Sequence, residues 1–314
     1  MKILITGGAG FIGSHLTREL LKNKSNTVIS LDDFTLGSKE NVLEFSKEDN
    51  FKFYEIDVTK IEDILKVTEG ETIDVIYHLA ANSDIQKCGQ NPNIDYYNTF
   101  LTTFSVLEYA RIKGIKKFFF SSTSAVYGNL IDIDLTEMQG GLMPISYYGA
   151  SKLASESFIS AFTHMNNMET VIFRFPNVIG PNLTHGVIFD FIRRLEQNPT
   201  ELQILGDGTQ QKPYIYVLDL VNGIVRFTEN MKPGVEVYNV GVEGETTVTN
   251  IANILCEEMG LANVKYNYTG GNIGWKGDVP RFKYDLSKIK AEGWNPKYNS
   301  DEAVRESIRK VLGK

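Results

Sequence analysis

Residues 1–13 read MKILITGGAGFIG, so an apolar run leads directly into a turn rich in glycine. The run Lys2–Thr6 has the near-continuous apolar pattern of a strand that is buried on both faces. From about Phe11 to Lys24, apolar residues recur at helical spacing. Strand, glycine-rich turn and helix in this order form the first unit of a Rossmann-type sheet, which predicts an α/β fold.

The glycine turn is the first candidate binding site. Gly7 and Gly10 would let the backbone turn tightly and approach a pyrophosphate, and Gly13 would let the helix pack closely on the strand. The helix N-terminus at Phe11 and Ile12 would offer free N–H groups and a partial positive charge to phosphate oxygens. We therefore expect these five residues to hold a dinucleotide. A glycine-rich turn without a ligand is the alternative.

The alternation of strands and helices continues along the chain. Further strands are expected at residues 27–32, 50–56, 74–80, 117–121 and 170–175, and helices at 61–68, 92–113 and 146–165. Because these strands are largely apolar and alternate with helices, they predict a doubly wound parallel sheet over residues 1–176. After Asn177, short strands at 202–205, 214–217 and 235–240 mix with helices at 219–228, 249–259 and 300–312. Residues 177–314 are therefore predicted to form mainly a smaller, mixed α/β substrate lobe.

Composition bounds the class of protein. The chain has 314 residues, of which 42% are hydrophobic and 23% are charged, as in ordinary soluble proteins. Its net charge of −7 gives a nucleic-acid partner no electrostatic support. Cys88 and Cys256 are too few for a disulfide framework, and the histidines are scattered, so we expect no metal site. With neither a signal-peptide pattern nor an apolar run of about 20 residues, we expect a cytoplasmic protein without a membrane partner.

Tyr148 and Lys152 are the first catalytic candidates. They lie one helical turn apart on the same face of the helix expected at 146–165. An ammonium group beside a tyrosine should lower the pKa of the phenol, because the phenolate gains an attractive neighbour. A phenol tuned toward neutral pH can take a proton from a hydroxyl group and return it. Tyr147 is a competitor, but only Tyr148 has a lysine four positions further on.

Hydroxyl and carboxylate side chains follow two of the predicted strands. Thr123 lies at the carboxyl end of the fifth strand, where open α/β sheets bind ligands, and Ser124 beside it could serve equally. Asp32 and Asp33 end the second strand, where a carboxylate can bind a ribose diol and repel a 2′-phosphate. Since no basic residue is evident there, NAD is favoured over NADP. A solvated turn residue is the alternative for Asp33.

Three features in this order resemble the extended short-chain dehydrogenase/reductase family: the glycine turn, residues 118–128 (FFFSSTSAVYG) and the Tyr148/Lys152 pair. The resemblance covers essentially the whole chain. Alignment with the family's Ser-Ser-x-x-Val-Tyr-Gly pattern favours Thr123. It implies that Thr123, Tyr148 and Lys152 are catalytic, with Tyr148 as general base and then general acid. It also implies that Lys152 binds the nicotinamide ribose.

The resemblance implies cofactor contacts elsewhere in the first domain. Asp57-Val58 resembles the family's adenine-binding pair, and residues 78–81 (HLAA) resemble a strand end whose small residues let the cofactor cross the sheet. Asn98 matches an asparagine near the active site, and an ordinary polar helix residue is the alternative there. The cofactor contacts implied beyond the glycine turn are Asp32, Asp33, Asp57, Val58, Leu79, Ala80, Ala81, Asn98, Ser121, Tyr148, Lys152 and Phe175.

Segments in the second half resemble nucleotide-sugar epimerases, and their pattern is nearest to that of UDP-glucose 4-epimerases, also called UDP-galactose 4-epimerases. The segments are 174–181 (RFPNVIGP), 206–217 (GDGTQQKPYIYV), 238–241 (YNVG) and 275–280 (WKGDVP). The substrate contacts implied for a UDP-sugar are Thr123, Ser124, Tyr148, Asn177, Lys212, Tyr214 and Asp278. The resemblance also implies that residues of about 210–232 return to the first domain. It further implies a homodimer built from the helices near 92–113 and 146–165.

The residues after Thr123 bear on the reaction. The related sugar 4,6-dehydratases carry Asp-Glu there, and UDP-glucuronate decarboxylases carry Glu at the second position, whereas this chain has Ser124 and Ala125. Without an acid to expel the C6 hydroxyl, the sequence favours epimerisation at C4, by transient oxidation to a 4-keto sugar and return of the hydride. Alternatives are a UDP-N-acetylhexosamine or UDP-uronate substrate, a net sugar-nucleotide oxidoreductase, and a catalytically silent binding protein.

Three residues depart from the pattern of the relatives. Lys212 stands where many have Arg, Ile273 where close relatives have Arg, and Ser83 where some epimerases have Lys. Lysine binds phosphate as a point charge but lacks the bidentate fork of arginine. The sequence therefore leaves open the sugar, the nucleotide base and the strength of diphosphate binding.

Overall fold

The computed structural model describes residues 1–314 except 86–88, 131–132 and 275–276, so Cys88 and the start of the 275–280 segment lie outside the described residues. The chain divides into two compact units. Unit 1 comprises Met1–Val126, Ser146–Arg174 and Val221–Tyr238, and unit 2 comprises Tyr127–Ile145, Phe175–Leu220 and Asn239–Lys314. The segment that returns to unit 1 is thus 221–238 rather than about 210–232. The assignment of 127–145 to unit 2 was not anticipated.

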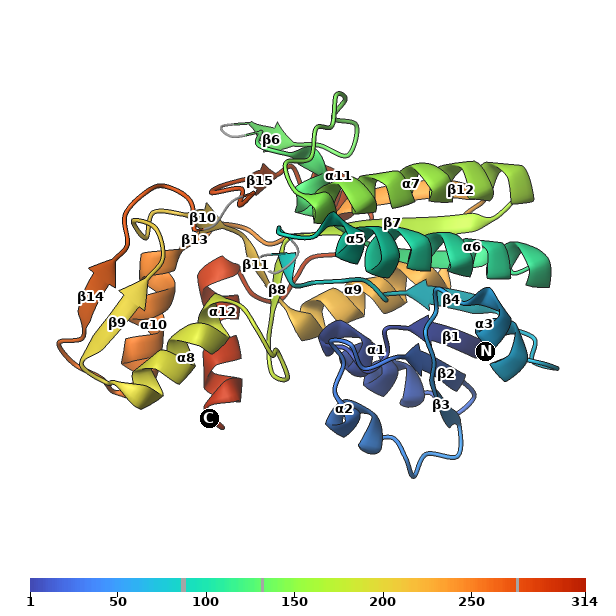
Figure 1. Ribbon diagram of the computed structural model, residues 1–314, viewed down its shortest axis with the longest axis horizontal. Coiled ribbons are helices and arrows are strands. Elements are labelled where there is room, and N and C mark those ends of the chain that lie inside the picture. Colours follow the sequence, from blue (N-terminus) through green and yellow to red (C-terminus); the bar gives the residue numbers. More distant parts are fainter. Residues whose placement is uncertain (86–88, 131–132, 275–276) are drawn as a thin grey trace. The chain divides into compact units, whose positions relative to one another are not determined.

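A seven-stranded sheet, counted over the described residues, forms the centre of unit 1 (Figure 1). Its strands in spatial order are β12 (Gly234–Asn239), β7 (Glu169–Phe175), β5 (Lys117–Thr123), β4 (Val75–His78), β1 (Lys2–Thr6), β2 (Thr27–Asp32) and β3 (Phe51–Glu55). The pairs β1–β2, β1–β4, β2–β3 and β4–β5 are parallel. The order runs in opposite directions from β1, so the predicted doubly wound α/β fold is confirmed.

β12 corrects the sequence interpretation, which assigned residues 235–240 to the substrate lobe. It is an edge strand of the main sheet, next to β7. Val235 and Val237 pack against the buried cluster that contains Leu4, Ile76 and Phe118. Apolar side chains on a short strand favour burial but do not say in which core, so the sequence could not place this strand.

Helices flank the sheet of unit 1 (Figure 1). They are α1 (Phe11–Leu21), α2 (Lys39–Leu43), α3 (Ile61–Val67), α5 (Pro92–Asp95), α6 (Thr102–Lys113), α7 (Tyr147–Asn166) and α9 (Val217–Glu229). The helix predicted at 92–113 is not continuous, because a π-helical turn, Tyr96–Leu101, separates α5 from α6. π-Helical turns often occur at functional sites, since the extra residue redirects the side chains that follow.

Unit 2 is built from short strand pairs and amphipathic helices. The pairs are β8 (Asn177–Ile179) with β11 (Tyr214–Tyr216), β9 (Glu201–Ile204) with β14 (Lys265–Tyr268), β10 (Gln211–Lys212) with β13 (Thr246–Thr247), and β6 (Asp134–Leu135) with β15 (Lys283–Tyr284). Its helices are α8 (Val187–Gln197), α10 (Val248–Met259), α11 (Ser287–Ala291) and α12 (Ser300–Val311). α8, which was not predicted, buries Ile188, Phe191 and Leu195 in the same core as α10 and α12.

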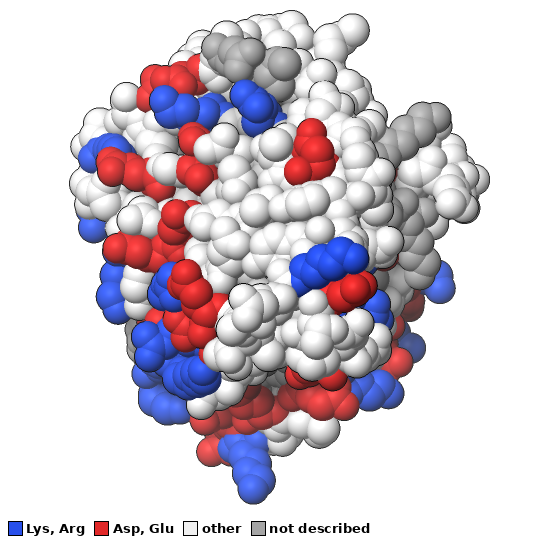
Figure 2. All heavy atoms as spheres, turned by 90° about the vertical axis from the view of Figure 1, so that its left-hand side faces the viewer, with Lys and Arg blue, Asp and Glu red and all other residues white. Residues whose placement is uncertain are grey.

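The surface and the helices bear on possible partners. Figure 2 shows positive and negative side chains intermixed on one face of the molecule rather than gathered into a single basic field. Within the described part of the chain, no helix is both long and apolar enough to cross a membrane.

Candidate functional site

The glycine turn lies against the carboxyl end of β4. Gly7 has a φ of +75°, and a Cβ there would lie 2.6 Å from the backbone nitrogen of Ala80. A Cβ at Gly13 would lie 2.1 Å from the carbonyl oxygen of Gly7. Only glycine fits either position. The predicted glycine turn and the predicted 78–81 strand end are therefore neighbours, at the point where the strand order of the sheet reverses.

The N-terminus of α1 is open to an anion. Its N-cap, Gly10, has no side chain to accept from the first N–H groups, and the first turn carries no acidic residue. N–H groups without an intrahelical partner, together with the helix dipole, attract phosphate oxygens. With the close backbone approach at Gly7 and Gly13, this geometry fits the diphosphate of a dinucleotide.

Asp32 is 8% exposed and is already hydrogen-bonded to the backbone. Its carboxylate accepts from the N–H of Ala9 (3.0 Å) and from the N–H of Phe34 (2.9 Å). Burial raises the pKa of Asp32 above its ordinary value, and these two hydrogen bonds oppose the shift. Asp32 thus ties the second strand to the glycine turn, while its remaining lone pairs can still accept from a ribose diol. Asp33 is exposed and accepts from the N–H of Thr35.

A basic side chain lies beside this loop, which the sequence analysis did not consider. The ammonium of Lys39 is 5.3 Å from the ring centroid of Phe34 and 3.9 Å from a carboxylate oxygen of Glu55. An ion pair between exposed side chains is weak, so Lys39 retains capacity for another anion.

The other predicted cofactor residues of unit 1 have varied settings. Asp57 accepts from the N–H and the hydroxyl of Thr59, which closes a turn. Val58 is 6% exposed and packs in the main core. Asn98 lies in the π-helical turn and is partly exposed, whereas its neighbour Thr99 is fully buried. Asn98 and Asp57 are thus both partly exposed, whereas Val58 is buried.

Thr123, Tyr148 and Lys152 come together in unit 1. Thr123 ends β5, and Tyr148 and Lys152 lie in the first two turns of α7, which begins where the Ser146 hydroxyl accepts from the N–H of Gly149. The hydroxyl of Thr123 lies close enough to the phenol of Tyr148 to lower the pKa of that phenol. The structure therefore places Thr123 beside Tyr148, the predicted base. From the residues alone, Ser124 was an equal candidate for this position.

Lys152 is 2% exposed. Its ammonium donates to the carbonyl oxygen of Ser121 at 2.6 Å and lies 4.6 Å from the ring centroid of Phe120. Burial lowers the pKa of Lys152 to about 7. The neighbouring His78 is fully buried, and burial lowers its pKa to about 3, so this imidazole is neutral near pH 7.

The pKa of Tyr148 differs from the sequence expectation. Burial raises it above its ordinary value, the neighbouring hydroxyl of Thr123 lowers it, and the charge of Asp95 raises it. The ammonium of Lys152, 5.9 Å from the centroid of the Tyr148 ring, does not outweigh the loss of water around a phenolate. In this structure Tyr148 is therefore a neutral phenol, and further positive charge is needed to make it a base.

The sequence analysis missed charged and polar residues next to Thr123, Tyr148 and Lys152. Glu156 lies one turn after Lys152 and accepts from Arg174 at 3.0 Å (Nε) and 2.6 Å (Nη2). The hydroxyl of Ser122 donates to the same carboxylate at 2.5 Å. The side chains of Arg174 and Glu156 are only 6% and 8% exposed. The spacing Tyr148, Lys152, Glu156 along one helix face was a signal for this residue.

The predicted substrate residues of unit 2 form two pairs. Asn177 lies opposite Tyr214 in the β8–β11 register, and their side chains are hydrogen-bonded. Burial raises the pKa of Tyr214 to about 12. Lys212 forms an ion pair of 2.5 Å with Asp278, whose second oxygen accepts from the N–H of Gly274. Phe175 also belongs to unit 2 and is 7% exposed.

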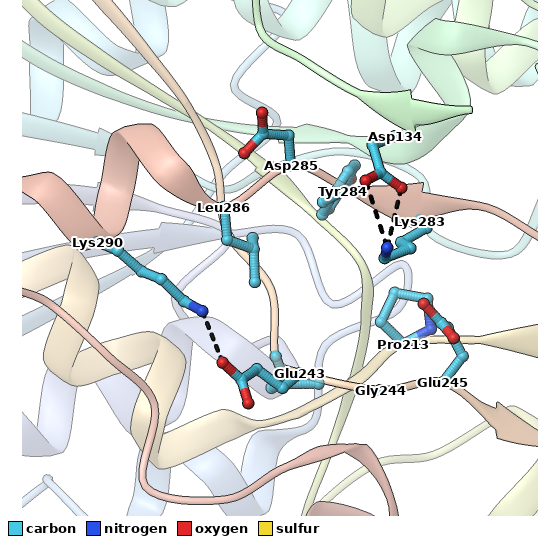
Figure 3. A pocket seen from close by; sticks show the side chains of 11 residues that line it. Asp134, Pro213, Glu243, Gly244, Glu245, Lys283, Tyr284, Asp285, Leu286 and Lys290 are labelled. Carbon is cyan, nitrogen blue, oxygen red and sulfur yellow. Dashed lines mark hydrogen bonds and ion pairs between the residues drawn. The ribbon is translucent and has the colours of Figure 1, made fainter.

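A pocket of about 310 Å³ lies within unit 2 (Figure 3). Its walls carry the ion pairs Lys283–Asp134 (3.0 Å) and Lys290–Glu243 (2.7 Å), together with the carboxylates of Glu245 and Asp285. Both ammonium groups are matched by carboxylates and further acids remain, so the pocket does not favour a diphosphate. None of the predicted substrate residues lines it. Among the described residues, no group of three or more His, Cys, Asp and Glu side chains could hold a metal ion.

Comparison with known proteins gives the family. Residues 3–241 match the NAD dependent epimerase/dehydratase family. The chain belongs to this family. A relative from Methanocaldococcus jannaschii, provisionally named a UDP-glucose 4-epimerase, is 31% identical over 98% of this chain and 97% of its own length. Members of the family are NAD-dependent, and NAD is the cofactor that the open helix N-terminus and glycine turn fit.

Solved structures agree on the fold but not on one substrate. A UDP-galactose 4-epimerase superposes with a TM-score of 0.86 at 32% identity, covering 100% of this chain and 99% of that one. The human dTDP-D-glucose 4,6-dehydratase is 29% identical over 98% of this chain and 89% of its own length. Epimerases and dehydratases of this family therefore have similar sequence identity to this chain. Similarity over the whole chain does not show which of the two reactions the protein catalyses.

Proposed function

We propose that the protein epimerises a nucleotide sugar at C4, with UDP-glucose and UDP-galactose as its substrates. The position of Thr123 at the carboxyl end of β5, with its hydroxyl beside the Tyr148 phenol and the buried Lys152 close by, carries this proposal. Such a group can remove the proton of a sugar hydroxyl and later return it. An epimerase of this kind needs the same proton transfer in both directions and no further acid.

The residues of unit 1 would divide the work. Thr123 orients the reacting hydroxyl, and Tyr148 takes and returns its proton. Lys152 supplies positive charge 5.9 Å from the centroid of the Tyr148 ring, and a cation at that place favours the phenolate. When bound, NAD supplies the acceptor and donor of the hydride, and its oxidised ring adds a second positive charge. The glycine turn and Asp32 would hold the dinucleotide, with Asp57, Asn98 and Ser121 as further contacts.

The residues that follow Thr123 support epimerisation over dehydration. Ser124 and Ala125 are partly buried and carry no carboxyl group. Loss of water from C5 and C6 needs an acid to protonate the leaving hydroxyl and a base to remove the C5 proton. Small side chains leave room for a keto sugar to turn over, which is what inversion at C4 requires.

Unit 2 would hold the nucleotide diphosphate. Lys212 is the natural contact for phosphate, although its ammonium is paired with Asp278. A diphosphate would share this ammonium rather than meet a free charge, and Asn177 and Tyr214 would add neutral hydrogen bonds. Ile273 is 45% exposed and offers no charge, so diphosphate binding rests on fewer cations than in relatives with arginine there.

Proton NMR of the purified protein with UDP-galactose tests the reaction, while absorbance reports any NADH. We expect the signals of UDP-glucose to appear without net NADH. UDP-N-acetylgalactosamine and UDP-glucuronate serve as competing substrates, and faster turnover of either would reassign the sugar. Steady accumulation of NADH would instead identify a net oxidoreductase, and absence of turnover with all three sugars by NAD-loaded protein would contradict the proposal.

We also propose that unit 1 pairs with a second copy of the chain through α5, α6 and α7, which lie side by side in Figure 1. Tyr96, Tyr97 and Phe158 are 48%, 51% and 41% exposed there. Phe158 contacts the rings of Phe100 (5.3 Å) and Phe104 (5.6 Å), which makes a continuous aromatic face. Contiguous apolar patches on a soluble protein mark interfaces, and a self-complementary helix face suits a two-fold dimer.

Size-exclusion chromatography with light scattering tests the dimer. The unmodified protein should elute as a dimer and Phe158→Glu as a monomer. Phe189→Glu is the matched control, because Phe189 is a similarly exposed aromatic (38%) on α8 of unit 2. A monomeric unmodified protein, or loss of the dimer in the control alone, would contradict this interface.

A further inference from the structure

Asp95 is a fully buried carboxylate that the proposed reaction does not use. It ends α5, and its Oδ1 accepts from the side-chain amide of Asn82 at 2.9 Å and, at 3.5 Å, from the hydroxyl of Thr99. Its Oδ2 is buried without a hydrogen-bond partner. Burying a carboxylate in this way is expensive unless a positive charge compensates.

Lys152 lies on an element that packs against Asp95. α5 and the π-helical turn pack against α7, which carries Lys152. The two charges interact electrostatically, with Lys152 favouring the ionised form of Asp95 and Asp95 favouring the ionised form of Lys152. The direct hydrogen bond of Lys152 goes to a neutral carbonyl, and none of the ion pairs among the described residues joins Lys152 to a carboxylate. Its ammonium therefore needs a counter-ion nearby.

Glu156 is the other candidate counter-ion and raises the pKa of Lys152 more than Asp95 does, but its oxygens are already engaged. Both of its oxygens accept from Arg174, and Ser122 adds a further hydrogen bond. The interior of unit 1 thus contains two cations and two anions in this region, Lys152, Arg174, Glu156 and Asp95. Since Glu156 and Arg174 satisfy each other, Lys152 and Asp95 remain as the second pair.

We infer that Asp95 is the counter-ion of Lys152, a positioning residue that keeps the buried ammonium charged without itself touching cofactor or substrate. The inference rests on the proposed function only in giving Lys152 a role in proton transfer. It explains why the Oδ2 of Asp95 is buried without a hydrogen-bond partner. It also supplies a negative charge for Lys152, whose own hydrogen bond goes to a neutral carbonyl.

The sign of the expected pH effect follows from the groups that surround Lys152. Burial lowers its pKa, Glu156 and then Asp95 raise it, and His78 on β4 is neutral near pH 7. The charge of Asp95 also raises the pKa of Tyr148. Replacing Asp95 by asparagine should therefore lower both pKa values. Both limbs of the pH–rate profile should move to lower pH, whereas a merely structural defect would lower the rate at every pH.

The direct test is the titration of Lys152 in the NAD-bound protein, followed by NMR of 13Cε-labelled lysine without any sugar. The Lys152 signal is assigned by its loss in Lys152→Met. In Asp95→Asn we expect the midpoint to fall by roughly half a unit or more, as for charges in adjacent packed elements. Thr99→Val is the matched control, because it removes a hydrogen bond to Asp95 but leaves the charge, and its midpoint should stay unchanged.

An unchanged Lys152 midpoint in Asp95→Asn would overturn the inference, since Asp95 would then be held in its neutral form. If Asp95→Asn does not fold, Lys152→Met provides the reciprocal measurement, in which the pKa of the Asp95 carboxyl should rise. An unchanged Asp95 pKa there would overturn the inference equally. The two proposals can fail separately. If the Lys152 midpoint shifts in Asp95→Asn but the unmodified protein turns over no UDP-sugar, the counter-ion inference stands and only the proposed function is refuted.

Discussion

The two units hold their functional charges in different ways. In unit 1, Lys152 is 2% exposed, and the Arg174 and Glu156 side chains are 6% and 8% exposed. Regular strands and the long helix α7 hold these groups. In unit 2, the side chain of Lys212 is 18% exposed and lies on the two-residue strand β10. The difference indicates that unit 1 holds its charges in place without a ligand, whereas Lys212, in the role proposed for it, would exchange part of its contact with Asp278 for a phosphate.

Loss of the Tyr148 hydroxyl should have the largest effect. Tyr148→Phe removes the proton-transfer group and leaves the ring, so kcat should fall by about 10²–10⁴-fold, the range for general acid–base catalysis. NAD content should stay the same. Tyr147→Phe is the matched control, because Tyr147 is the adjacent tyrosine and is 49% exposed. Equal losses in both variants would mean that the tyrosine pair acts through folding rather than chemistry.

Arg174→Met should be the most damaging change to stability. It leaves the buried Glu156 with the neutral hydroxyl of Ser122 as a hydrogen-bond donor but without its cation, and breaking one side of a buried ion pair lowers the free energy of unfolding by about 3–5 kcal/mol. Urea unfolding followed by circular dichroism measures this loss. The double variant Arg174→Met, Glu156→Leu should recover much of it. A double variant no more stable than the single one would show that the loss comes from packing.

Lys212→Ala should have a smaller and different effect. The residue is partly exposed and would bind the ground state and transition state equally, so KM should rise by about 10-fold with kcat nearly unchanged. Lys212→Arg restores the charge with a bidentate fork and should lower KM again. Initial rates over a range of UDP-galactose concentrations separate the two constants. A fall in kcat without a change in KM would mean that Lys212 acts in the chemical step rather than in substrate binding. The proposed difference between the two units would then be wrong.

The smallest effect is expected at Glu71, which forms ion pairs with Lys2 and Lys52 and has no role in the proposed reaction. Hydrogen bonds from Lys2 and Lys52 lower the pKa of Glu71 to about 2. Because the folded pKa lies below the unfolded value, this stabilisation is present above pH 4.5 and is lost as the pH falls through about 2. Both lysines are partly exposed, so Glu71→Gln should lower the free energy of unfolding at pH 7 by under about 1 kcal/mol. A loss as large as that of Arg174→Met would contradict the distinction between buried and exposed pairs.

The sequence predicted unit 1 better than unit 2, for physical reasons. The β1 strand, the glycine turn and α1 are local features, and apolar runs with helical spacing report them directly. The strands of unit 2 contain two to four residues, which carry too little periodicity to be assigned. The same limit explains β12, whose valines signal burial but not which core they enter.

The sequence predicted which residues of unit 1 lie together at the candidate site but not their electrostatics. Tyr148 and Lys152 share a helix face because of their spacing, and Thr123 ends a strand, so these positions could be found. The raised pKa of Tyr148 depends on how much water surrounds the phenol, which is a property of the folded chain. Asp95 escaped notice because its closeness to α7 depends on tertiary packing across a π-helical turn.

The most direct test of the central claim is the fate of a deuterium placed at C4 of UDP-galactose. If the protein inverts C4 by removing a hydride and returning it to the other face, the UDP-glucose product should keep the deuterium at C4 in ordinary water. Proton NMR and mass spectrometry of the product measure this retention. Product that carries hydrogen from solvent at C4, or that forms with loss of water from the sugar, would contradict the account.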